Sequence, residues 1–310
     1  MKTVFLFPGQ GSQRPEMLDS FSTADAIAAD VFSDVKEILG EEARDLDSEQ
    51  RLQSTVYTQL CLLIASVISA RELQAKGVRP DFVAGHSVGA FSAAVVSGVL
   101  SFKQALSLVH TRGQLMEQAY PQGYGMAALT GISESALQNI LVAFNRDHGT
   151  VYLSNVNAAD QQVVAGRLSD LQQLITQLET GGIRKAQLLH VAVPSHCPLM
   201  SGVSGQLEQA LGQLRLQEPA IPYASNHTGR VLRTSDAIRT DLARSVATTL
   251  RWNDATSLIY ELGGRIFIEM EPSGVLAKLA ASTFPEAKVL SLTSGETDTT
   301  AWLWKTYQQQ

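Results

Sequence analysis

Residues 81–100 read DFVAGHSVGAFSAAVVSGVL and indicate how the first third of the chain folds. The apolar run Phe82–Gly85 predicts a short buried strand, and the Ala/Val-rich segment predicts a helix that begins at or just after Ser87. Between them GHSVG forms a G-x-S-x-G turn, so tight that small residues are needed on both sides of the serine. The pattern therefore predicts a nucleophile at Ser87, raised above the sheet. The alternative is a plain glycine turn with an incidental serine.

The helix after this turn bears on the chemistry expected at Ser87. A helix that starts here points backbone N–H groups and the positive end of its dipole at an oxyanion formed on the serine. The backbone amide of Val88 is the first candidate donor. The turn therefore predicts part of an oxyanion hole as well as a nucleophile.

A serine needs a general base at neutral pH, and the chain has six histidines. His196 lies in VAVPSHCPLM (residues 191–200), at the end of a predicted strand and between two prolines that would make the loop rigid. It is the best candidate base by context. Of the others, His86 lies in the turn, His110 on a polar helix arc and His190 in an apolar strand. The last two, His148 and His227, lie in Gly/Asn-rich loops. Cys197 is an alternative nucleophile, but adjacent side chains point apart and the turn already supplies one.

The segment SFKQALSLVHTRGQLMEQA (residues 101–119) predicts an amphipathic helix with an arginine near its apolar stripe. At 100° per residue Arg112 falls at the edge of that stripe, away from the polar arc. A guanidinium there must be paired or reach water. It is either an arginine packed by its stem or a fixed clamp for a carboxylate, which a guanidinium binds with two parallel hydrogen bonds.

The rest of the chain predicts a large α/β domain formed by residues 1–123 and 193–310. Its core is expected to contain the apolar strand at residues 3–7 and an almost wholly apolar helix at 55–73. The final third returns to α/β patterning, with a strand at 265–269 and a helix starting near Gly274.

Residues 124–192 predict a second unit inserted in the first. Their pattern is strand, helix, strand, strand, helix and strand, and the last strand covers residues 185–193. Ser133 and Ser169 are candidate helix N-caps, and Gly181 with Gly182 is a candidate helix stop. The βαββαβ order is typical of a ferredoxin-like subdomain.

Composition excludes several classes of partner. With 24 basic and 30 acidic residues the net charge is −6, and no Lys/Arg run could follow a nucleic-acid backbone. No run approaches a membrane span, and the apolar start is too short for a signal peptide. Cys61 and Cys197 are isolated, and no histidine pair has metal-ligand spacing with a matching acid. We expect a cytoplasmic protein without membrane, nucleic-acid, metal or cofactor binding.

Five ordered motifs resemble the malonyl-CoA:acyl carrier protein transacylase family over nearly the whole chain. They are FPGQGSQ (7–13), GHSVG (85–89), RGQLMEQAYPQGYGMAAL (112–129), SNVNAADQQVVAG (154–166) and VPSHCPLM (193–200). The resemblance implies an α/β-hydrolase-like large domain with an inserted ferredoxin-like subdomain. It also implies transfer of a malonyl group from malonyl-CoA, the substrate, to the thiol of an acyl carrier protein.

The resemblance also assigns roles to single residues. Ser87 would be the acylated nucleophile and His196 its base, and the backbone N–H groups of Gln10 and Val88 would form the oxyanion hole. Arg112 would bind the malonyl carboxylate. A further residue, expected near the site, is Asn157.

The chain departs from the family pattern at two places. In the family a backbone carbonyl near a glutamine orients the histidine, and here Ser245 occupies the place of that glutamine. The second departure is GHSVGAF, with Ala90 and Phe91, where members from fatty-acid synthesis read GHSLGEY. This variant resembles the malonate decarboxylase epsilon subunit, which implies a carrier subunit with a phosphoribosyl-dephospho-CoA thiol.

Three alternatives stay open beside the decarboxylase subunit. One is the malonyl-CoA:acyl carrier protein transacylase of fatty-acid synthesis. The turn at Ser87 alone would also suit a serine esterase, although no HGGG-type oxyanion segment occurs. A non-catalytic subunit that only docks a carrier protein is the third.

Overall fold

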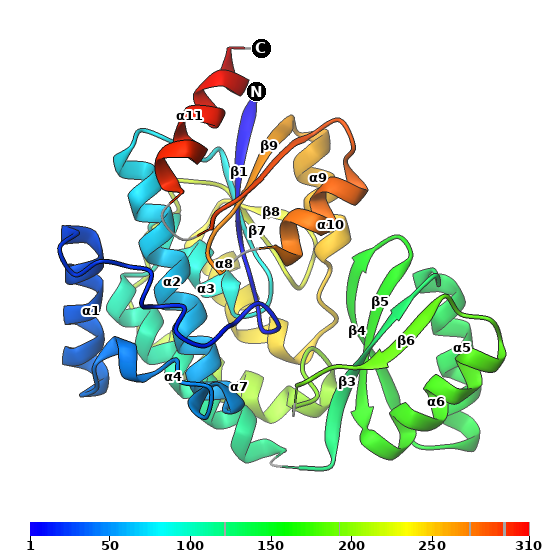
Figure 1. The fold of residues 1–310 in the computed structure, drawn as a ribbon. Coiled ribbons are helices and arrows are strands. Elements are labelled where there is room, and N and C mark those ends of the chain that lie inside the picture. The colour runs from blue at the N-terminus through cyan, green and yellow to red at the C-terminus, as the bar shows by residue number, and fades with distance from the viewer. Residues whose placement is uncertain (121, 192, 273, 294–295, 310) are drawn as a thin grey trace.

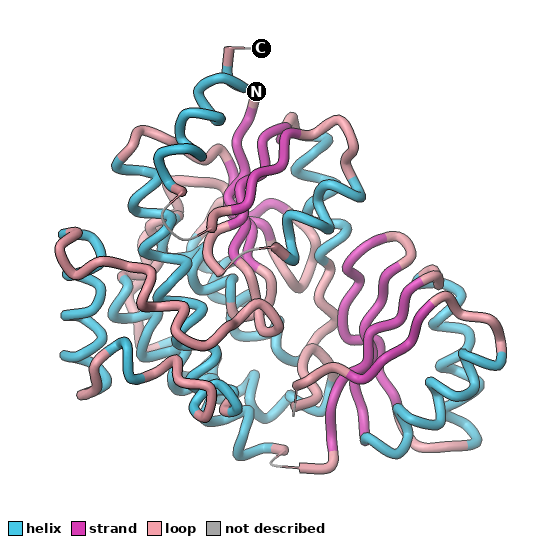
Figure 2. The backbone as a smooth tube through the Cα atoms, viewed as in Figure 1, coloured by secondary structure: helices cyan, strands magenta, loops and turns pink. Residues whose placement is uncertain are grey.

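The computed structural model describes residues 1–120, 122–191, 193–272, 274–293 and 296–309. The chain forms a mixed α/β fold with two separate sheets, drawn in magenta in Figure 2. The larger sheet has the order β10-β9-β1-β2-β7-β8 and is parallel except for the β7–β8 pair. Its strands are β1 (Lys2–Phe7), β2 (Phe82–Gly85), β7 (Tyr223–Ala224), β8 (Val231–Leu232), β9 (Gly264–Glu269) and β10 (Lys288–Ser291).

Helices cover both faces of the larger sheet (Figure 1). On one face Phe5 and Phe7 of β1 join a core formed with α1 (Ala26–Leu39), α2 (Thr55–Ala75), α3 (Gly89–Val96), α4 (Phe102–Ala119), α8 (Ser235–Arg244) and α11 (Thr297–Gln308). On the other face Val4 and Leu6 pack with α9 (Trp252–Glu261) and α10 (Val275–Thr283). A strand buried on both faces needs apolar residues throughout, which explains the continuous run at residues 3–7.

Apart from the two helices of the smaller sheet described below, the other helices of the described residues are α7 (Ser201–Gly212) and the short 3₁₀ helices η1 (Ala43–Asp45), η2 (Arg51–Gln53), η3 (Pro198–Met200) and η4 (Ser245–Ala247). The α7 side chains Val203 and Leu207 pack with Met116 of α4 and Val246 of η4. This small cluster lies beside the loop that carries His196, which is between β6 and η3 in the chain.

The smaller sheet is antiparallel, with the order β4-β5-β3-β6. Its elements follow the chain as β3 (Tyr124–Thr130), α5 (Glu134–Asp147), β4 (Val151–Ala158), β5 (Gln161–Arg167), α6 (Leu168–Thr180) and β6 (Lys185–Leu188). The predicted βαββαβ order is confirmed. One face of the sheet packs on α5 and α6, which lie at the outer side in Figure 1. On the other face Met126 and Val163 pack toward Cys197.

Several predicted details are confirmed and several are wrong. Ser133 caps α5 by accepting from the Ala136 N–H at 3.3 Å, and α6 stops at Gly181. Ser169 is not an N-cap, because α6 begins one residue earlier and its N-cap is Arg167. The last strand ends at Leu188 instead of residue 193. The predicted boundary at residue 192 lies outside the described residues.

Among the described residues one helix, α2, is long and apolar enough to span a membrane by length and composition. The sequence prediction that no run approaches such a span is therefore wrong for residues 55–75. Within the fold, 83% of the apolar window of α2 is buried. The apolar surface of α2 faces other helices and the larger sheet.

Candidate active site

The GHSVG turn has the strained geometry that its sequence predicts. Ser87 follows the end of β2 and has φ of 55°, in the left-handed region that costs a non-glycine residue about 1–3 kcal/mol. A Cβ on Gly85 would lie 2.1 Å from the Gly89 carbonyl oxygen, and one on Gly89 would lie 2.2 Å from the Phe7 carbonyl oxygen. Glycine is required at both positions because backbone occupies that space. The helix α3 starts at Gly89, two residues later than the earliest predicted start.

Ser87 and His196 are hydrogen-bonded, although 109 residues separate them in sequence. His196 Nε2 lies 2.8 Å from Ser87 Oγ, and His196 Nδ1 lies 2.6 Å from the backbone carbonyl oxygen of Ser245. A carbonyl oxygen only accepts, so Nδ1 carries the proton and Nε2 is free to accept the serine proton. The backbone contact expected at Ser245 is therefore present.

His196 is held in its neutral form. It is 2% exposed, and burial together with the positive charge of Arg112 lowers its pKa from 6.5 to about 3. At pH 7 the imidazole is thus an unprotonated base pointing at a hydroxyl. This arrangement can remove the serine proton and return it to a leaving group.

Arg112 is a buried cation beside Ser87. Its side chain extends from α4 and is 1% exposed. Nη2 donates to Ser87 Oγ at 3.2 Å and Nη1 donates to Gln59 Oε1 at 2.6 Å, while no partner of Nε occurs among the described residues. Burial alone lowers the pKa of Arg112, to about 10. The guanidinium therefore stays charged at pH 7, next to Ser87 Oγ, with unused capacity to bind a carboxylate.

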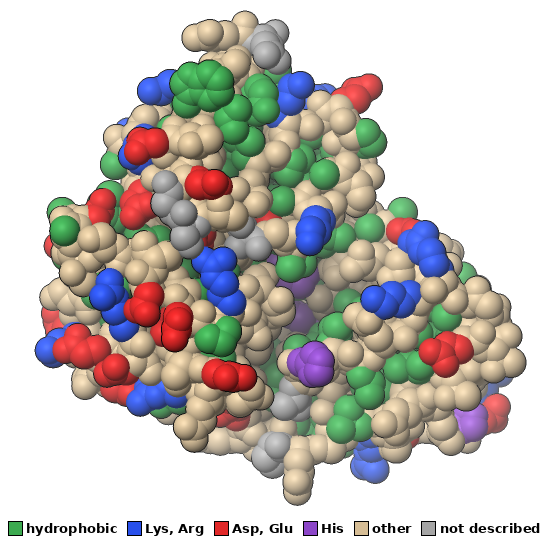
Figure 3. Space-filling view, viewed as in Figure 1, with side chains coloured by type: hydrophobic (Ala, Val, Ile, Leu, Met, Phe, Trp, Pro, Cys, Tyr) green, Lys and Arg blue, Asp and Glu red, His purple; other side chains and the backbone are tan. Residues whose placement is uncertain are grey.

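A cavity of about 250 Å³ opens at Ser87 and His196 between the two sheets. The face of the molecule drawn in Figure 3 is hollowed, and histidine atoms are visible in the hollow. Gln10 lines the cavity from the loop after β1, which lies next to the turn because Phe7 and Gly85 are register partners. Asn157 lines it from β4 of the smaller sheet, where its Oδ1 lies 3.1 Å from His86 Nε2.

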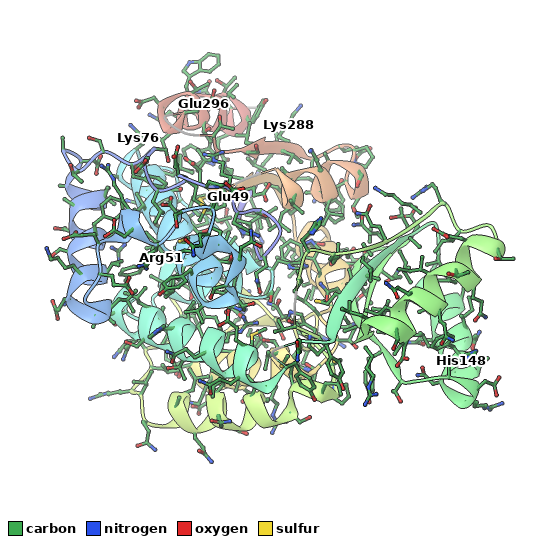
Figure 4. The ribbon with its side chains drawn as sticks, turned by 60° about the horizontal axis from the view of Figure 1, so that its bottom comes forward. Glu49, Arg51, Lys76, His148, Lys288 and Glu296 are labelled. Atoms are coloured by element: carbon green, nitrogen blue, oxygen red, sulfur yellow. The ribbon has the colours of Figure 1, made fainter. Side chains whose placement is uncertain are left out.

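No other candidate histidine or cysteine is hydrogen-bonded to Ser87 Oγ among the described residues. His148 lies at the outer end of the smaller part of the molecule in Figure 4, and His227 Nδ1 lies 3.0 Å from Thr248 Oγ1. His190 falls after the end of β6. Burial raises the pKa of Cys197 to about 11, so its thiol is protonated and weakly nucleophilic. No group of three or more His, Cys, Asp or Glu side chains that could hold a metal ion occurs among the described residues.

Two functional contacts could not be found from the sequence. Gln59 is fully buried on α2, where it accepts from Arg112 and donates from Nε2 to Gln10 Oε1 at 3.3 Å. Asn226 accepts the backbone N–H of Ser87 on its side-chain oxygen at 3.0 Å. A glutamine inside a strongly apolar helix is a signal for a buried polar partner. Asn226 lies in SNHTG, which has the composition of an ordinary turn.

The comparisons with known proteins agree with this geometry. The model of the acyl transferase domain matches residues 4–302. The malonyl CoA-acyl carrier protein transacylase of Haemophilus influenzae is 32% identical over 298 residues, covering 94% of this chain and 95% of the relative. The solved structure of the Coxiella burnetii transacylase has a TM-score of 0.92 at 32% identity, covering 97% of this chain and 96% of the other.

A third similar structure contains a partner. It is a malonyl-transacylase in complex with its type II PKS acyl-carrier protein, with a TM-score of 0.91 at 31% identity, covering 97% of this chain and 99% of that one. The match of the domain model and the identities over nearly complete chains lead to one conclusion. The chain belongs to the acyl transferase family that includes the malonyl CoA-acyl carrier protein transacylases.

Proposed function

We propose that this protein transfers a malonyl group from malonyl-CoA to the thiol of an acyl carrier protein through a malonyl ester on Ser87. The observation that carries the proposal is a neutral His196 bonded to Ser87 Oγ, with the buried Arg112 guanidinium on the same oxygen. The names of the relatives support the substrate pair. Two acyl transfers at one serine then make up the reaction.

In the first transfer His196 Nε2 takes the Ser87 proton while Oγ attacks the thioester carbonyl carbon. The carbonyl oxygen becomes an oxyanion, for which we propose the backbone N–H groups of Gln10 and Val88 as donors. When the C–S bond breaks, the CoA sulfur leaves with the proton from His196. The second transfer reverses these steps, with the carrier thiol giving its proton to His196 and attacking the ester.

Arg112 gives the reaction its expected preference for malonyl. A buried guanidinium with an unused Nε is costly in the free protein, and a carboxylate would satisfy it with charge-assisted hydrogen bonds. An acetyl group offers no such partner. We propose Asn157 as a further substrate-binding residue because it lines the cavity from the opposite sheet.

For the acceptor, the comparisons favour the transacylase of fatty-acid synthesis over the decarboxylase subunit. The relatives described above are named malonyl CoA-acyl carrier protein transacylases. The decarboxylase epsilon subunit rests on Ala90 and Phe91, which are buried at 0% and 1% exposure in α3. Neither lines the cavity, so neither touches a bound carrier thiol there. We therefore propose an ordinary phosphopantetheine carrier first and the decarboxylase carrier subunit second.

Four accompanying expectations stay predictions. They are the α/β-hydrolase-like character of the larger domain, the domain boundaries near residues 123 and 193, the absence of a cofactor and the cytoplasmic location. The parallel sheet with the serine turn after β2 supports the first of them.

The proposal is tested by mixing the protein with malonyl-CoA or acetyl-CoA and a carrier bearing a phosphopantetheine thiol, then weighing the carrier. We expect rapid loading of malonyl, slow loading of acetyl and no loading by Ser87→Ala. Hydrolysis of malonyl-CoA without loading would favour the esterase. Carrier binding that survives Ser87→Ala, with no loading by the parent protein, would favour the docking subunit.

A further inference from the structure

The side chain of Asn226 bridges Gly85 and Ser87 in the first half of the serine turn. The residue follows β7 and is 3% exposed. Its Nδ2 donates to the Gly85 carbonyl oxygen at 2.7 Å, and its Oδ1 accepts from the Ser87 N–H at 3.0 Å. One side-chain amide thus holds the backbone on both sides of His86, at Gly85 and at the strained Ser87.

This bridge continues the pairing of β2 with β7. The two strands are parallel neighbours up to the pair Ala84 and Ala224. Strand β2 ends at Gly85, so the regular ladder between β2 and β7 stops before the turn. A carboxamide has the same donor and acceptor as a peptide group. Asn226 therefore supplies from a side chain the hydrogen bonds that a continued strand would supply from its backbone.

Asn226 is itself fixed through its backbone. Its N–H donates to Asp241 Oδ2 at 3.3 Å, and its carbonyl accepts from the Arg251 N–H at 2.7 Å. Asp241 is 2% exposed on α8. The same carboxylate accepts three more hydrogen bonds around the turn, from the Tyr223 hydroxyl, the Ser225 hydroxyl and the His227 N–H.

The helix that carries Asp241 also leads to the carbonyl that orients His196. The last residue of α8 is Arg244, and the next residue, Ser245, accepts from His196 Nδ1. A second hydrogen bond links the loop of Asn226 to this segment, because His227 Nδ1 lies 3.0 Å from Thr248 Oγ1. One segment, residues 241–248, thus helps to position both Ser87 and His196.

We propose that Asn226 is a positioning residue that keeps Ser87 in its left-handed conformation, and that Asp241 fixes Asn226 relative to the carbonyl that orients His196. The proposal rests on the acyl transfer proposed above. It requires an amide at position 226, since the site needs one donor and one acceptor. A carboxylate would set a negative oxygen against the Gly85 carbonyl, and a serine is too short to bridge both groups.

The nearly isosteric variant Asn226→Asp tests this requirement. We expect the saturating rate of malonyl-serine formation to fall by about 100-fold, as for other small misplacements of a reacting group. The malonyl-CoA concentration giving half of that rate should change less than about twofold, because Arg112 and the cavity are untouched. Labelling of Ser87 by phenylmethylsulfonyl fluoride should slow in parallel, since this reagent has neither a carboxylate nor CoA.

Asn145, on the helix α5 that packs on the smaller sheet, provides a matched control. Its side-chain amide also bridges backbone groups, donating to the Val151 carbonyl and accepting from the Val151 N–H, both at 2.9 Å. Asn145→Asp should lower the melting temperature without changing either rate, measured well below the unfolding transition. If Asn226→Asp does not fold, Asn226→Ser removes the bridge without adding a charge and is expected to slow both reactions.

Two results would overturn the inference. One is a folded Asn226→Asp or Asn226→Ser protein that reacts at the parent rate with both reagents, and the other is an equal loss in Asn145→Asp. Failure of the proposed function looks different. In that case the parent protein forms no malonyl ester, while its sulfonyl fluoride labelling still depends on Asn226.

Discussion

At Arg112 the requirements of stability and of function oppose each other. Arg112 has no carboxylate partner among the residues that the structure describes, and its charge is buried at the cost of its hydration. Because Arg112 lies next to Ser87 Oγ, the cost of burying its charge is offset only when a substrate carboxylate binds there. Functional sites commonly carry such locally unfavourable groups.

Arg112→Met keeps the unbranched stem and removes the charge. We expect the ratio of malonyl to acetyl transfer to fall about 10- to 100-fold, since charge-assisted hydrogen bonds contribute roughly 1.5–3 kcal/mol. The melting temperature of the free protein should stay equal or rise. Initial rates with the two thioesters measure the ratio, and acetyl transfer in the same variant is the control. An unchanged ratio would contradict the role of Arg112.

The lowered pKa of His196 predicts an unusual pH profile. A base is active above its pKa, so a value of about 3 keeps His196 active far below the ordinary 6.5. The rate of malonyl-serine formation at saturating malonyl-CoA should stay flat between about pH 8 and pH 5. A rate that halves near pH 6.5 would show that the imidazole is solvated instead. Rapid-quench measurements across this range, with the folded fraction checked at each pH, decide between them.

The sequence predicted Ser87, His196 and Arg112 but not Gln59 or Asn226. The first three carry reactive or charged groups in strongly patterned surroundings, so their chemistry is visible locally. Gln59 and Asn226 act through hydrogen bonds to residues 53 and 139 positions away in the chain. Such contacts depend on how whole elements pack, and no local pattern reports them.

At the scale of single elements the serine turn depends on space that only glycine leaves free. Gly89→Ala would place a methyl group 2.2 Å from the Phe7 carbonyl oxygen, between β1 and α3. We expect a loss of about 3 kcal/mol or more in the free energy of unfolding, because backbone on both sides cannot move away. Urea unfolding measures it.

The control for Gly89→Ala is a glycine in open surroundings. Gly205 lies inside α7, and an added Cβ there meets no atom within 4 Å. Gly205→Ala should stabilise the protein by about 0.5–1 kcal/mol through helix propensity alone. Equal effects of the two substitutions would mean that the turn is not closely packed.

Element boundaries show what the sequence could not define. The apolar run at residues 185–193 predicted one strand, but β6 ends at Leu188 because the chain then crosses toward His196. Leu189 and Val191 line the cavity. The strands β7 and β8 were not predicted, since they have only two residues each and carry no recognisable period.

At the scale of the whole molecule the site is formed where two sheets meet. Ser87 and Gln10 come from the larger sheet and Asn157 from the smaller, and the cavity lies between them. The sequence predicted both units and their order. Their relative placement could not be predicted, because it depends on contacts such as the pairing of Val156 N–H with the Leu250 carbonyl at 2.9 Å.

The choice of carrier protein is expected to depend on the molecular surface around the cavity. We expect a higher kcat/KM for malonyl transfer to a phosphopantetheine acyl carrier protein than to a carrier with a phosphoribosyl-dephospho-CoA thiol. Because Ala90 and Phe91 are buried, exchanging them for Glu and Tyr should not reverse the preference. Competition between both carriers for one pool of malonyl-CoA measures it. A preference for the second carrier would restore the decarboxylase subunit as the main hypothesis.

The central claim is that Ser87 accepts a malonyl group. It is tested most directly by intact mass spectrometry after brief mixing with malonyl-CoA or acetyl-CoA, on the parent protein and on Ser87→Ala. We predict a malonyl adduct on the parent, little acetyl adduct, and neither adduct on the variant. An unmodified parent protein, or a malonyl adduct that persists in Ser87→Ala, would contradict the account.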